Sequence, residues 1–138
     1  MKMRLCAMVI AALGALSTIP VAAHHSLNAE FDNKKTVTVK GVMTSIQWIN
    51  PHIFFYVDAK DKDGTTTWAV ETFPPNHMRS RYGLTKAVLG ADVLNAKEVT
   101  VEINPATSGK KLGWLTKITY PDGHFIKLTV DPGSPEAR

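Results

Sequence analysis

The chain has 138 residues, a formal net charge of +4 and 44% hydrophobic residues. This length allows one domain with a single hydrophobic core, and it leaves no room for a second domain of ordinary size. The basic residues include only isolated pairs, Lys34–Lys35 and Lys110–Lys111, so we expect no nucleic-acid partner.

The first 23 residues predict a secretory signal peptide. Met1 to Arg4 is basic, Leu5 to Ile19 is largely apolar, and Val21-Ala22-Ala23 supplies the small residues that a signal peptidase reads. Gly and Ser interrupt the apolar run, which is shorter than the roughly 20 residues that a spanning helix needs. We therefore expect a periplasmic or secreted protein without a membrane span after cleavage, with His24 as its first residue.

Cleavage would remove Cys6, the single cysteine, together with Lys2 and Arg4. The 115 residues that remain would carry a net charge of +2 and no thiol. Disulfides and thiolate metal sites are then excluded, so a metal ion would need nitrogen or oxygen ligands.

The first strands of the mature chain show a period of two. Apolar and polar residues alternate from Thr36 to Lys40, Gly41 is expected to form a bulge or bend, and Val42 to Ile49 continues one long, curved strand. Asn50–Pro51 ends it.

A hairpin follows. His52 to Asp58 predicts a second strand and Thr65 to Thr72 a third, and Lys60 to Gly64 reads as the turn between them. These two strands are expected to pair antiparallel.

The second half begins with helical spacing. Asn76 to Leu89 predicts one or two short helices broken near Gly83. Strands are then predicted over Val99–Ile103, Leu112–Tyr120 and Phe125–Val130.

This order predicts an all-β fold: a small OB-like Greek-key barrel of five to six strands over residues 24–130, with a short helical connection between strands three and four. An open α+β sheet is the alternative. Closure is preferred because the chain is short and closure removes strand edges. Residues 131–138 are expected to be a disordered tail.

Four motifs resemble a family of small, exported and functionally uncharacterised bacterial proteins. They are His24-His25-Ser26, Glu30-Phe31-Asp32, Trp48-Ile49-Asn50-Pro51-His52 and Thr67-Trp68-Ala69-Val70-Glu71. The chain departs from that family at Val88 to Val93, which lacks the expected Pro-Gly-Asp turn. The resemblance implies an OB-like fold and a secreted location, and it implies no activity.

The histidines near the predicted mature start suggest a metal site. An N-terminal His24 offers its α-amine and its ring to one ion, and a ring from His25 or His52 would complete a three-nitrogen set that suits copper, with zinc or nickel as alternatives. Cleavage after Ala22 would instead put a histidine third, as in square-planar copper or nickel sites. In the alternative interpretation these histidines are solvated and His52 only shapes a turn. His77 and His124 are expected to be surface residues.

The aromatic residues suggest a second hypothesis. A strand face on or near the second and third strands would bind an extended ligand, either a glycan or a peptide, or a periplasmic protein partner. Its residues would be Trp48, Phe54, Tyr56 and Trp68. Alternatively, these side chains pack beneath neighbouring segments.

Enzymatic motifs are lacking. The chain has no phosphate-binding glycine loop, no HExxH and no G-x-S-x-G. The acids Glu30, Asp32, Asp58 and Glu71 are expected at hairpin ends, caps and solvated faces. We therefore expect a binding module rather than an enzyme, with an oxidative copper enzyme as the alternative.

Overall fold

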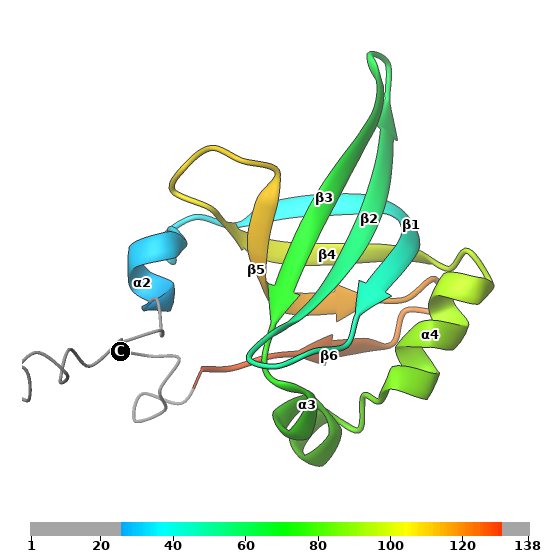
Figure 1. The fold of residues 1–138 in the computed structure, drawn as a ribbon. Helices are drawn as coiled ribbons and strands as arrows, with labels where there is room; N and C mark the ends of the chain where they lie inside the picture. The colour runs from blue at the N-terminus through cyan, green and yellow to red at the C-terminus, as the bar shows by residue number, and fades with distance from the viewer. Residues whose placement is uncertain (1–25, 131–138) are drawn as a thin grey trace, which may run out of the picture.

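The computed structural model describes residues 26–130, and its strands follow the predicted alternation. The strands are β1 (Val37–Gln47), β2 (Ile53–Asp61), β3 (Gly64–Thr72), β4 (Glu98–Pro105), β5 (Leu112–Thr119) and β6 (Phe125–Lys127). They are ordered β3-β2-β1-β4-β5-β6, and a parallel pairing of β3 with β5 closes the first five into a barrel (Figure 1). The predicted OB-like barrel is confirmed, with β6 added to its edge.

Strand β1 bends because it pairs with two different neighbours. Val37 to Val42 pair with β4, and Val42 to Gln47 pair with β2. The predicted long, curved strand is therefore confirmed. The bulge lies between Met43 and Ser45, however, and not at Gly41.

Gly41 has a different role from the predicted one. It pairs regularly with Val99, and a Cβ atom at this position would lie 2.3 Å from the carbonyl oxygen of Asp58. A glycine is therefore required for the close approach of β2, which is a recurrent use of glycine inside strands.

Two helices connect β3 to β4, namely α3 (Pro75–Tyr82) and α4 (Lys86–Leu94). Gly83 ends α3 with a φ of 68°, and the Thr85 hydroxyl accepts a hydrogen bond from the Val88 amide at the start of α4. The predicted break at Gly83 is confirmed, although α4 continues to Leu94. No helix within residues 26–130 is long and apolar enough to cross a membrane.

The barrel core is formed by alternate strand residues. Ile53, Phe55 and Val57 of β2 are completely buried, as are Val70 of β3 and Val101 of β4. Each residue between them in β2 therefore points to the outer face. That outer face carries the candidate site.

The segment before β1 lies across the ends of β4 and β5 (Figure 1). We call residues 26–35 the N-terminal strap. It contains a one-turn helix, α2 (Leu27–Glu30), for which the sequence shows no helical pattern. Backbone and side-chain hydrogen bonds tie the strap to residues 104–107: Asp32 N to Pro105 O at 2.9 Å, Thr107 N to Glu30 O at 2.9 Å and Asn104 Nδ2 to Lys35 O at 2.7 Å. The buried side chains of Leu27 and Phe31 complete this attachment.

Candidate functional site

A carboxylate and an imidazole meet on the outer face of the barrel. Nδ1 of His52 lies 2.5 Å from Oε1 of Glu71. His52 directly follows a cis Asn50–Pro51 peptide bond and precedes β2, and Glu71 is near the end of β3. The two side chains are only 18% and 7% exposed, so the pair is largely withdrawn from water.

The strand register explains why an acid is buried outside the core. Glu71 lies opposite Phe54 of β2 and opposite Trp114 of β5. Its neighbour Val70 faces the core, so Glu71 must face outward. The His52 imidazole contacts its carboxylate there, and Trp114 packs against that imidazole.

Trp114 joins this pair to the N-terminal strap. Its ring meets His52 edge-on at 5.4 Å between centroids, Phe73 at 5.1 Å and Phe31 at 6.1 Å. Trp114 is only 3% exposed. Thus the first described part of the chain and His52 pack against the same indole.

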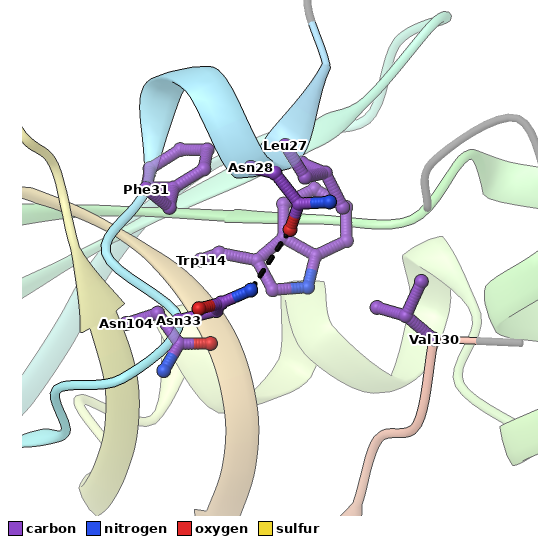
Figure 2. Close-up of a pocket in the computed structure, with 7 residues that line it drawn as sticks. All are labelled: Leu27, Asn28, Phe31, Asn33, Asn104, Trp114 and Val130. Carbon is purple, nitrogen blue, oxygen red and sulfur yellow. Dashed lines mark hydrogen bonds between the residues drawn. The ribbon is translucent and has the colours of Figure 1, made fainter. Parts of the chain in front are cut away.

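A pocket of about 230 Å³ opens beside Trp114 (Figure 2). Its walls combine apolar side chains with three asparagines: Leu27, Phe31, Trp114, Val130, Asn28, Asn33 and Asn104. Asn33 Nδ2 donates a hydrogen bond of 2.9 Å to Asn28 Oδ1. The strap therefore forms one wall and β4 and β5 form another.

The predicted metal ligands are placed only in part. His24 and His25 lie outside the described residues, and His52 lies in the pair with Glu71. In the part of the chain from residue 26 to residue 130, no three His, Cys, Asp or Glu side chains are grouped closely enough to hold a metal ion.

The four predicted aromatic residues do not share one face. Phe54 and Tyr56 alternate with buried core residues and point outward, half-buried. Trp68 lies opposite Val57, so it points to the inner face, where Lys111 Nζ lies 5.0 Å from its ring centroid. Trp48 packs against the core. The register of the hairpin separates Trp68 from Phe54 and Tyr56, because directly paired residues share a face.

The two remaining histidines differ from each other. His124 is exposed, as expected, with Nδ1 2.5 Å from Asp122 Oδ1. The expectation of a surface residue holds only in part for His77, which is half-buried. Its ring stacks on Phe73 at 4.2 Å between centroids, and its buried Nε2 has no hydrogen-bond partner among residues 26–130. Contacts with Phe73 and, at 5.8 Å between centroids, with Tyr82 hold this ring.

Among the acids singled out in the sequence, Asp32 and Asp58 behave as expected. Asp32 accepts an ion-pair contact of 2.8 Å from Lys35, and this hydrogen bond lowers the pKa of the carboxyl group. Asp58 accepts a 2.6 Å hydrogen bond from Thr67. Glu71 is the exception, because it is buried against His52.

Glu71 and Trp114 are the site residues that sequence reasoning missed. A signal for Glu71 was present in Trp68-Ala69-Val70-Glu71, where a single acid falls within an apolar strand. Trp114 gave no such signal, because it lies in the apolar run Leu112 to Leu115, which is typical of a core strand.

Comparison with known proteins agrees with the motifs. Residues 12–116 match a family described as a family of unknown function, DUF6152. No curated protein matches the sequence. The matched range includes the His52–Glu71 pair, Trp114 and the whole strap, and the chain belongs to this family of unknown function.

Proposed function

We propose that this domain binds a divalent transition metal, with copper preferred, through His52 and the histidines at the predicted mature start, His24 and His25. The observation that supports this most strongly is the His52–Glu71 pair. A carboxylate bonded to Nδ1 leaves Nε2 to face the metal, and metal-ligating histidines are commonly oriented in this way. In residues 26–130, Nε2 of His52 makes no hydrogen bond.

The strap supports the participation of the chain start. Leu27 and Phe31 are fixed beside Trp114, and Trp114 contacts His52. His24 precedes Leu27 by three residues, which can span up to about 10 Å. In this proposal, those three residues would bring the α-amine and ring of His24 to the His52 ring.

The donor set determines the choice of metal. The α-amine and ring of His24, together with the His52 ring, would supply three nitrogen atoms and no sulfur. Nitrogen ligands in a T-shaped or square arrangement suit Cu(II), which also forms the most stable complexes among the divalent ions of this series. In this proposal the protein acts after export to the periplasm.

The alternative of a metal-free adaptor has less support. Its predicted binding face would need Trp68 beside Phe54 and Tyr56, and the hairpin register puts Trp68 on the other side. We therefore favour metal binding over recognition of an extended ligand by these residues.

Calorimetric titration of Cu(II) into the protein purified after natural processing tests the proposal. The first residue is determined by mass spectrometry. We expect one ion per chain, with affinity reduced at least tenfold by His24→Ala and by His52→Ala. His124→Ala is the matched control, because His124 also lies 2.5 Å from a carboxylate oxygen but is far more exposed. Unchanged affinity in both test variants would overturn the proposal.

A further inference from the structure

We infer that the pocket beside Trp114 binds a small, neutral aromatic molecule that carries a hydroxyl group, of the phenol class. This site is separate from the proposed metal ligands and does not depend on them. The inference is based on the size of the pocket, its lack of charge and its unused hydrogen-bonding atoms.

The volume sets the size of the ligand. The pocket holds about 230 Å³, whereas a buried apolar cavity of about 150 Å³ already accommodates benzene. Drug-sized ligands occupy roughly 300 to 1,000 Å³. A single ring with one or two substituents therefore fits, and an extended glycan or peptide does not.

The walls set the polarity of the ligand. Leu27, Phe31, Trp114 and Val130 present apolar surface, and the other lining residues are asparagines. None of the residues that line this pocket carries a charge. A charged ligand would lose its hydration there without a counter-charge, so a neutral ring is favoured.

Two polar atoms that make no hydrogen bond within residues 26–130 are available to a hydroxyl group of a ligand. The Trp114 indole N–H donates no hydrogen bond within residues 26–130. It is not one of the buried polar atoms that lack a partner, so it remains accessible from the pocket. Figure 2 shows the indole between Leu27 and the asparagines, with its nitrogen on the edge toward Val130. This group can therefore donate to an oxygen of a ligand in the pocket.

Asn104 offers the matching hydrogen-bond acceptor. Its Nδ2 donates to the Lys35 carbonyl at 2.7 Å, which fixes the orientation of the amide and makes Oδ1 the remaining polar atom. In the described part of the chain this Oδ1 accepts no hydrogen bond. A hydroxyl group can accept from the indole and donate to an amide oxygen, whereas an ether can only accept.

Nuclear magnetic resonance tests the inference through the indole N–H signal of Trp114. The three tryptophan signals are assigned with Trp48→Phe and Trp68→Phe, which identify Trp114 by elimination without altering the pocket. The probes are phenol, anisole and toluene. From the number of ligand atoms, we expect a dissociation constant for phenol on the order of 1 mM.

We expect phenol to shift the Trp114 signal and to bind at least fivefold more tightly than anisole, with toluene weakest. Asn104→Leu should remove the preference for phenol over anisole, and the matched Asn95→Leu at the C-cap of α4 should retain it. His52→Gln should retain phenol binding even where it abolishes copper binding, so the two sites can fail separately. No shift of the Trp114 signal with phenol, or equal affinities for phenol and toluene, would overturn the inference.

Discussion

Glu71 holds Nδ1 of His52 at 2.5 Å and leaves Nε2 of the same ring without a hydrogen bond inside residues 26–130. An imidazole held in this way has a fixed orientation. Because both side chains are largely buried, water competes little for the contact. Glu71 is therefore a positioning residue for the proposed metal ligand.

Replacing Glu71 with Gln should lower copper affinity about 10- to 100-fold, the usual effect of losing an outer carboxylate partner. The amide keeps the size of the side chain and removes its charge. Glu102→Gln is the matched control, because Glu102 is a strand acid that pairs with Lys117 away from His52. The measurement is the calorimetric copper titration, and equal affinities in the two variants would argue against a positioning role.

Truncating Phe31 should destabilise the domain by about 3 to 5 kcal/mol, as expected for a buried aromatic residue. Phe31 is 3% exposed and anchors the strap against Trp114. Phe125→Ala is the control, because Phe125 is 57% exposed, and we expect a loss below about 1 kcal/mol. Urea unfolding of both variants measures the difference; similar losses would show that the strap contributes little to stability.

Gly41→Ala should destabilise the protein by about 1 to 3 kcal/mol or more, the usual range for an overpacked interior. The new Cβ would lie 2.3 Å from a backbone oxygen that a side-chain rotation cannot move. Gly90→Ala in α4 should have the opposite sign, with a gain of about 0.5 to 1 kcal/mol, because nothing lies within 4 Å of its Cβ position. Thermal unfolding compares the two, and a neutral Gly41→Ala would contradict the close approach of β1 and β2.

Tyr120 should make the fold sensitive to alkali. Burial raises the pKa of Tyr120 well above its ordinary value of 10.0, and the charge of Asp92 and the hydrogen bond that the hydroxyl donates to Asp92 raise it further. Above that value the unfolded chain loses the phenolic proton while the folded chain keeps it, so the free energy of unfolding falls as pH rises.

Tyr120→Phe should reduce the slope of the free energy of unfolding against pH by up to about 1.4 kcal/mol per pH unit, which is the value for one full proton. Urea unfolding between pH 8 and about 11.5 measures both slopes. Tyr56→Phe, at a half-buried outward position, is the control. Parallel slopes for wild type and Tyr120→Phe would contradict the assignment.

The fold was predictable because its main signals are local. Alternation in β2, the turn before Gly64 and the helix break at Gly83 each follow from a few neighbouring residues. The OB order then follows from the sequence of these elements. The position of the bulge was not predictable, because Gly41 is constrained by Asp58, a residue on another strand.

The candidate site was predictable only at His52. Its partner Glu71 is 19 positions away, and only the register of β2 with β3 brings the two together. The same register puts Trp68 on the opposite side of the sheet from Phe54 and Tyr56. Alternation shows which residues of one strand share a face, but it does not show which face of the next strand they lie beside. The parallel pairing of β3 with β5 places Trp114 beside Glu71, and no local sequence pattern specifies this pairing.

Copper quenching of Trp114 fluorescence tests the central proposal most directly, because the His52 ring lies 5.4 Å from the indole. The measurement uses the Trp48→Phe/Trp68→Phe variant, in which Trp114 is the remaining tryptophan and can be excited selectively over the three tyrosines. We expect emission to fall in proportion to added Cu(II) until one equivalent is bound, and His52→Ala or His24→Ala to abolish this stoichiometric quenching. Emission that is unchanged by one equivalent of copper, or quenching that persists without His52, would contradict a metal site at the His52–Glu71 pair.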